Sequence, residues 1–253
     1  MPYATVRDLQ MYYELHGPED GPQLALLNGA LGFIGQGGHW DYHVNAFSEA
    51  GYRVLIYEHR GHRRTNNPPA HFNGYDEFAD DAIALFDCVG FTRPHIAGLS
   101  DGAITALSLG MRYSQRVGSL VVAAANYYQD EAILKFVNDF TPELLREHMT
   151  ALVADLDSKM PGQWEELWNQ TRLMFRTNPA YSLTQLGGIT SPTLVLAGDR
   201  DFIISLDQTI DIYKAIPESE LCILPATNHV ITMERPELST TIILDFLTRR
   251  GNN

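Results

Sequence analysis

The chain has few cysteines and few basic residues, and each shortage excludes a class of protein. Its 253 residues include only two cysteines, Cys88 and Cys222, far apart among apolar neighbours. This spacing predicts two separate buried thiols rather than a disulfide or a metal pair. Eighteen lysines and arginines oppose 31 aspartates and glutamates, which gives a net charge of −13. Phosphates and anionic lipid headgroups would be repelled, so we expect neither nucleic acid nor a membrane as a partner.

Long apolar runs are also missing. No uninterrupted apolar segment approaches the ~18 residues that a membrane-spanning helix needs. Residues 1–8 lack the basic segment followed by an apolar one that marks a secretory signal. We therefore expect a cytoplasmic protein. A chain of 253 residues is long enough for one large domain with a sizeable core, and we expect a monomer or a homodimer.

The order of the predicted elements is typical of the α/β class. Two opening strands, residues 3–9 and 11–16, precede strands that alternate with helices, which predicts a mostly parallel central sheet flanked by helices. From about residue 126 to 186 the pattern is helical instead. We therefore predict a core of residues 1–125 and 187–253, with residues 126–186 as an inserted helical cap. The other predicted strands are 24–27, 53–57, 95–97, 120–124, 193–197 and 221–224, and the clearest helices are 42–50, 75–89, 206–215 and 236–249.

The most specific motif is Gly98-Leu99-Ser100-Asp101-Gly102, which lies between a predicted strand and the helical pattern of residues 103–109. A serine at such a sharp strand-to-helix turn has a strained backbone, and the flanking glycines avoid clashes with the neighbouring strand and helix. The helix N-terminus supplies free N–H groups and a dipole that favours negative charge. The motif therefore predicts a nucleophile elbow in which Ser100 is the nucleophile.

A serine hydroxyl needs a base to become a nucleophile, and the base needs a carboxylate to orient it. The chain order expected for this elbow is serine, acid, histidine. His229 follows the last predicted strand in a polar loop and is the favoured base, whereas His148 is interpreted as a surface or cap histidine. Two acids follow the strand that ends near residue 197. Asp201 is favoured as the orienting acid, and Asp199 is expected to hold the turn by backbone hydrogen bonds.

Acyl transfer also needs two backbone N–H donors for the developing oxyanion. One is expected from Asp101, directly after the nucleophile, and the other from Ala30 in the glycine-rich loop 29–38. The glycine spacing of this loop differs from that of a dinucleotide-binding loop. His39 and His43 have the spacing of a zinc-binding helix but lack its glutamate and a third ligand. We therefore expect no metal and no organic cofactor.

Residues 98–107, 124–127, 198–201 and 228–229 together resemble the α/β-hydrolase superfamily. Within it, the chain is most similar to the valacyclovir hydrolase-like (biphenyl hydrolase-like) serine esterases. The resemblance implies an α/β-hydrolase fold with a helical cap. It also implies a catalytic triad of Ser100, Asp201 and His229, with an oxyanion hole at Ala30 and Asp101.

Two loops depart from the family pattern. Asn28 stands where the family commonly has histidine, and residues 58–65 replace the usual Asp-x-Arg-Gly-x-Gly-x-Ser. In the esterases of this group, the aspartate after the nucleophile attracts the ammonium of an amino-acid ester. The alternative for Asp101 is a purely favourable position in the first turn of a helix.

The expected function is that of a serine hydrolase that cleaves small carboxylic esters through an acyl-enzyme on Ser100. Lactone hydrolysis and C–C bond hydrolysis by the same triad remain alternatives, as does a receptor that binds a ligand without turnover. Aromatic residues of the helical segment, Tyr127, Trp164 and Trp168, are expected to line the substrate pocket, although helical spacing is also typical of packing against the core.

Overall fold

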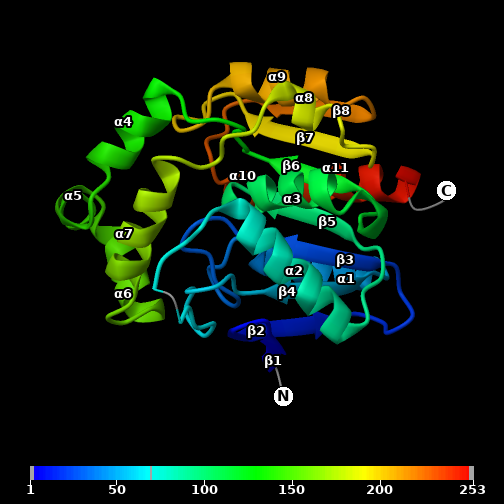
Figure 1. The fold of residues 1–253 in the computed structure, drawn as a ribbon, viewed down its shortest axis with the longest axis horizontal. Helices are drawn as coiled ribbons and strands as arrows, with labels where there is room; N and C mark the ends of the chain where they lie inside the picture. The colour runs from blue at the N-terminus through cyan, green and yellow to red at the C-terminus, as the bar shows by residue number, and fades with distance from the viewer. Residues whose placement is uncertain (1–2, 69, 251–253) are drawn as a thin grey trace.

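The computed structural model describes residues 3–68 and 70–250. At its centre is an eight-stranded sheet in the order β1-β2-β4-β3-β5-β6-β7-β8 (Figure 1). Strand β2 pairs antiparallel with β1 and β4, and the remaining pairings are parallel. The predicted α/β architecture is therefore confirmed. The strands are β1 (Tyr3–Val6), β2 (Leu9–His16), β3 (Gln23–Leu27), β4 (Arg53–Tyr57), β5 (His95–Leu99), β6 (Leu120–Ala123), β7 (Thr193–Gly198) and β8 (Ser219–Leu224).

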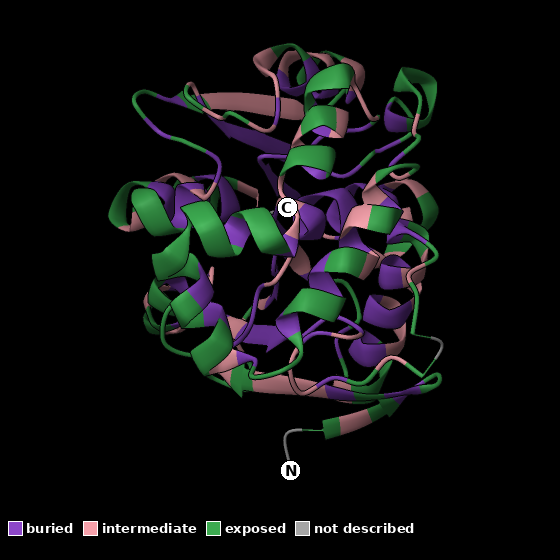
Figure 2. Ribbon diagram, turned by 90° about the vertical axis from the view of Figure 1, so that its left-hand side faces the viewer, coloured by how far each residue is buried: buried purple, intermediate pink, exposed green. Residues whose placement is uncertain are grey.

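Helices cover both faces of the sheet, so its central strands are buried on both sides (Figures 1 and 2). Because successive side chains of a strand point to opposite faces, β4 contributes to two cores. Leu55 and Tyr57 belong to one apolar cluster, and Val54 and Ile56 to the other. The first cluster is covered by α2 (Tyr75–Val89), α3 (Asp101–Arg112) and α9 (Leu206–Ala215), and the second by α1 (Asp41–Glu49) and α11 (Pro236–Arg250).

The helical pattern between β6 and β7 forms five helices, of which the first four extend beyond one end of the sheet, while the fifth lies beside α9 (Figure 1). Polar caps start the first two. The side chain of Asp130 accepts a hydrogen bond from the backbone N–H of Ile133, and Thr141 accepts one from Leu144, which satisfies donors that a helix start leaves free. The helices are α4 (Glu131–Asp139), α5 (Pro142–His148), α6 (Thr150–Lys159), α7 (Trp164–Phe175) and α8 (Leu183–Leu186).

Most predicted elements agree with the structure to within three residues, and α2 ends as expected at Gly90, which has a left-handed backbone with φ 75°. The short helix α10 (Ile231–Glu234) was not predicted, because four residues carry no periodic signal. One prediction is wrong: Cys88 is exposed on α2, and Cys222 is only partly buried. No helix within the described ranges is long and apolar enough to cross a membrane.

Candidate active site

Ser100 lies at the turn between β5 and α3, with a strained backbone of φ 53° and ψ −118°. The neighbouring glycines are required by contact with other backbone atoms. A Cβ atom on Gly98 would lie 2.2 Å from the carbonyl oxygen of Gly102, and one on Gly102 would lie 2.2 Å from that of Leu27. The predicted strand–turn–helix arrangement is therefore present, and it holds the serine at the carboxyl end of the parallel strands.

Three predicted side chains, distant in the sequence, form one hydrogen-bonded row. Nε2 of His229 lies 2.9 Å from Oγ of Ser100, and Nδ1 lies 2.8 Å from Oδ2 of Asp201. The other carboxylate oxygen of Asp201 accepts hydrogen bonds from the backbone N–H groups of Ile203 and Ile204, each 2.9 Å long. Because an ionised carboxylate only accepts, Nδ1 carries the ring proton and Nε2 is free to accept the serine proton.

Close packing of the loops after β7 and β8 sets the acid opposite the histidine. A Cβ atom on Gly198 would lie 2.2 Å from the carbonyl oxygen of Thr227, so only glycine permits this approach. Asp199 accepts a hydrogen bond from the backbone N–H of Thr227 at 3.3 Å. It thus braces the histidine loop, while Asp201 faces the imidazole. His148, with 65% of its side chain exposed, ends α5 on the surface.

Two backbone amides border the space in front of the serine. Among the residues that the structure describes, no group accepts a hydrogen bond from the N–H of Ala30 or of Asp101, and Ala30 borders the cavity described below. The adjacent amide differs, because the N–H of Gly29 donates to Nδ1 of His39 at 3.1 Å. The loop after β3 therefore offers the amide of Ala30, not that of Gly29, to an oxyanion.

The side chain of Asp101 is buried beside the nucleophile, with the residue only 2% exposed. The hydroxyl of Tyr75 donates to its Oδ1 at 2.9 Å, while Oδ2 has no hydrogen-bond partner within the described part of the chain. Burial raises the pKa of this carboxyl to about 7, although the Tyr75 hydrogen bond and the charge of His229 act in the opposite direction. The carboxyl group of Asp101 is therefore not a solvated surface group, although it lies in the first turn of α3.

A cavity of about 240 Å³ lies in front of Ser100 and His229, between the sheet edge and the helices α6 and α7. Trp168 lines it, with its indole N–H donating to the carbonyl oxygen of Phe140 at 2.6 Å. Most of the wall is apolar, so the cavity favours a hydrophobic group next to the reacting carbon. Its other apolar side chains include Phe33, Phe136, Leu156, Phe175, Ile203 and Met233.

Two of the three predicted pocket aromatics do not line this cavity. The hydroxyl of Tyr127 is directed away and donates to Asp211 on α9 at 3.1 Å. Trp164 is buried within the apolar cluster of the cap helices and donates to Asp157 at 2.6 Å. Trp164 and Trp168 share one face of α7, but four residues correspond to about 6 Å along a helix axis. Only the tertiary placement of α7 decides which ring reaches the cavity.

The atypical segment 58–65 still connects the loops around the site. Glu58 is fully buried, and its carboxylate accepts hydrogen bonds from the backbone N–H of Ile34 at 3.2 Å and of Arg64 at 2.9 Å. The guanidinium of Arg64 pairs with the same carboxylate. The loop after β3 is thereby tied to the loop after β4. Glu58 and Arg64 thus connect the two loops, although segment 58–65 departs from the Asp-x-Arg-Gly-x-Gly-x-Ser pattern.

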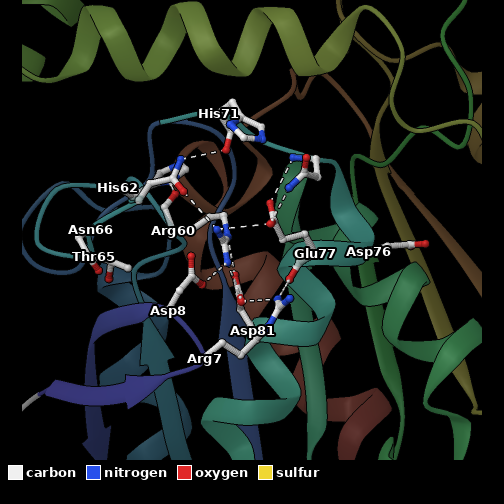
Figure 3. Close-up of polar contacts among 12 residues, drawn as sticks. Arg7, Asp8, Arg60, His62, Thr65, Asn66, His71, Asp76, Glu77 and Asp81 are labelled. Carbon is white, nitrogen blue, oxygen red and sulfur yellow. Dashed lines mark hydrogen bonds and ion pairs between the residues drawn. The ribbon is translucent and has the colours of Figure 1, made fainter. Parts of the chain in front are cut away.

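Arg60 anchors the other side of that loop (Figure 3). Only 1% exposed, it donates to both carboxylate oxygens of Asp81 on α2, at 2.7 and 3.0 Å. Arg7, from the β1–β2 turn, donates to the same carboxylate at 2.7 Å. Asp8 and Glu77 also form ion pairs with Arg60. A buried charge cluster of this kind holds the loop to the sheet edge and to α2.

Sequence reasoning missed the main polar neighbour of the oxyanion loop, which is His39. In the sequence, His39 stands out only by its zinc-like spacing from His43. In the structure, His43 is buried and its Nε2 lies 2.9 Å from Oγ of Ser239 on α11, while His39 lines the cavity. The described residues contain no group of three or more side chains that could hold a metal ion. A histidine at the end of a glycine-rich loop was the available signal.

Comparisons with known proteins bear on the family and the fold of the chain. The family model described as serine aminopeptidase, S33, matches residues 23–236. A relative from Agrobacterium fabrum named "Putative carbamate hydrolase RutD" is 24% identical over 94% of this chain and 98% of its own length. The enol-lactonase from Burkholderia xenovorans LB400 superposes with a TM-score of 0.79 at 22% identity, covering 98% of this chain and all of that one. A structure from a study of carboxylesterases of Nitrososphaera gargenis has a TM-score of 0.86 at 20% identity and covers 99% of both chains.

Proposed function

The chain belongs to the serine aminopeptidase (S33) family of α/β-hydrolases, and from this premise we propose that it is a serine hydrolase that cleaves carboxylic esters through an acyl-enzyme. The observation that carries the proposal is the row Ser100–His229–Asp201, with contacts of 2.9 and 2.8 Å. Both lie within the range needed for proton transfer and for orienting a base.

In the first half-reaction, Oγ of Ser100 attacks the ester carbonyl carbon while its proton moves to Nε2 of His229. Asp201 accepts the hydrogen bond from Nδ1 and stabilises the resulting imidazolium. The carbonyl oxygen becomes an oxyanion, which accepts hydrogen bonds from the amides of Ala30 and Asp101. The C–O bond then breaks, and the leaving alkoxide takes the proton from His229 and departs as an alcohol.

In the second half-reaction, water attacks the acyl-enzyme. His229 takes the proton of the water, the same amides stabilise the second oxyanion, and Ser100 leaves with the proton returned from Nε2. The products are an acid and an alcohol, and the enzyme is regenerated. The apolar wall of the cavity, which includes Phe136 and Trp168, supports a substrate with a small hydrophobic group.

Esters of α-amino acids are a second candidate within this class, favoured by one specific observation. Oδ2 of Asp101 is buried and has no hydrogen-bond partner among residues 3–68 and 70–250, and a substrate ammonium would supply a counter-charge. Benzyl alaninate and benzyl isobutyrate differ mainly in an ammonium against a methyl group. An Asp101→Asn variant should lower the ratio of their kcat/KM values at pH 8; an unchanged ratio would exclude amine recognition by Asp101.

The serine mechanism is tested with p-nitrophenyl butyrate and a fluorophosphonate probe. Wild-type protein should turn over the ester and gain the mass of one probe adduct. Ser100→Ala should lose both, and the matched control Ser158→Ala, at an exposed position of α6, should retain both. Equal rates for wild type and Ser100→Ala would leave a ligand-binding receptor as the better explanation.

The same assay separates the reaction classes that relatives suggest. A lactone, a phenyl carbamate and a vinylogous diketone should be compared with the ester, because each places an electrophilic carbonyl carbon at Ser100 with a different leaving group. The proposal expects the highest kcat/KM for the ester. A larger kcat/KM for one of the other substrates would assign the protein to that reaction class, with Ser100 still as the nucleophile.

A further inference from the structure

His39 lies where the glycine-rich loop meets α1, directly beside the nucleophile. A Cβ atom on Gly29 would lie 3.1 Å from Cβ of Ser100 and 3.3 Å from Cε1 of His39. Both side chains therefore flank the same glycine. His39 also forms part of the cavity wall, so its ring is a neighbour of the reacting atoms rather than a distant support.

The hydrogen bond from Gly29 determines which ring nitrogen of His39 carries a proton. Because the backbone N–H donates to Nδ1, this atom has no proton, and the single proton of the neutral ring lies on Nε2. Burial, together with the charges of His229 and His62, lowers the pKa of His39 to about 4. The ring therefore stays neutral above about pH 5 and keeps one N–H donor.

Within the described part of the protein this donor has no hydrogen-bond partner, and His39 is only partly buried, so its ring remains accessible from the cavity that it lines. The other side-chain N–H groups around the cavity are engaged, because Trp168 donates to a backbone carbonyl and His229 donates to Asp201. An N–H group beside an apolar cavity that lacks a protein acceptor favours a substrate that brings one.

We propose that His39 selects acyl groups that carry an ether or carbonyl oxygen on the carbon next to the scissile carbonyl, by donating a hydrogen bond from Nε2 to that oxygen. This rests on the ester hydrolysis proposed above. The acyl side follows from the mechanism, since the leaving alcohol takes its proton from His229 and must lie on that side. The loop that holds Gly29 and His39 then borders the acyl chain.

Two ester substrates with the same chain length test the inference. p-Nitrophenyl methoxyacetate has an oxygen where p-nitrophenyl butyrate has a methylene group. The selectivity is the kcat/KM for methoxyacetate divided by that for butyrate. Comparing this ratio between protein variants cancels the different intrinsic reactivity of the two esters.

Two substitutions separate the two nitrogens of His39. His39→Asn places an acceptor near the position of Nδ1, which can hold the Gly29 amide, but it has no donor at the position of Nε2. It should lower the selectivity about tenfold, the typical effect of one hydrogen bond. His39→Gln places a donor near Nε2 but removes the acceptor, so it should lower both kcat/KM values while changing the selectivity less than about twofold. The control His148→Asn, on the surface of α5, should change neither.

A selectivity equal to wild type in His39→Asn would overturn the proposal, and so would an equal loss of selectivity in His39→Asn and His39→Gln. The first result would assign His39 a role in holding the loop only. Circular dichroism and thermal unfolding of both variants identify a folding defect. If the wild type hydrolyses neither ester, the proposed esterase function itself fails, which is a different result from turnover with unaltered selectivity.

Discussion

Replacing Asp101 by asparagine should change the stability of the protein in a pH-dependent way. The unfolding free energy of the variant minus that of wild type should be larger at pH 8 than at pH 5. Asp101 is 2% exposed, its Oδ2 has no partner among the described residues, and burial raises its pKa from 3.8 to about 7. Asparagine has nearly the same shape, and its side-chain oxygen can still accept the hydrogen bond from Tyr75. The substitution therefore removes the titration while keeping the contact.

The sign follows from proton linkage. In the unfolded chain the carboxyl has a pKa near 3.8, so between about pH 4 and 7 the folded state binds more protons than the unfolded state. The contribution of this carboxyl to the unfolding free energy is therefore largest below pH 4 and decreases as the pH rises towards 7. Each pH unit corresponds to about 1.36 kcal/mol. Between pH 5 and pH 7, Asp101 should cost the wild type about 2–3 kcal/mol of unfolding free energy.

Urea unfolding at pH 5, 6, 7 and 8 measures this effect in wild type and in Asp101→Asn. Buried histidines such as His59, whose burial lowers its pKa, titrate in both proteins, so the difference between the two isolates Asp101. The control Asp155→Asn, at an exposed position of α6, should keep the pH dependence of wild type. If the difference between wild type and Asp101→Asn is the same at all four pH values, the raised pKa is refuted.

Four further substitutions test other contacts. Arg60→Met leaves a buried carboxylate with a single arginine partner and should cost about 3–5 kcal/mol in urea unfolding; a loss under about 1 kcal/mol would contradict a structural role of the cluster. Gly102→Ala places a Cβ atom 2.2 Å from a backbone carbonyl oxygen and should lower the thermal midpoint by several degrees or prevent folding, whereas an unchanged midpoint would show that the turn can relax. Asp201→Asn should lower kcat for p-nitrophenyl butyrate roughly 10³–10⁴-fold, because an amide N–H facing Nδ1 favours the tautomer of His229 whose Nε2 carries the proton and cannot accept that of Ser100. Asp199→Asn should lower kcat less than about tenfold; equal losses would contradict the assignment of Asp201 as the acid.

Local sequence patterns were sufficient to predict most of the helices and strands, and also the three residues Ser100, Asp201 and His229 that form the hydrogen-bonded row. Strand β4 and helices α2 and α9 have the predicted bounds, because apolar period and turn residues act within a short segment. Ser100, Asp201 and His229 could be chosen because each follows the carboxyl end of a parallel strand, and such ends meet at one edge of the sheet. Asp199 and Asp201 follow the same strand, so the choice between them depends on their positions in the turn and not on that topology.

The type of sheet, the nucleophile elbow and the side chains that meet there follow from the amino-acid sequence, since they depend on periodicity, on glycine positions and on strand order. Three features depend on tertiary packing: Trp168 rather than Trp164 lines the cavity, Oδ2 of Asp101 is buried with no partner in the described ranges, and Nδ1 of His39 accepts a hydrogen bond from the amide of Gly29. Each of these depends on the surroundings of a side chain, namely how deeply it is buried and which atoms of distant segments face it. Neighbours in the chain do not specify those surroundings, because packing between helices, loops and strands sets them.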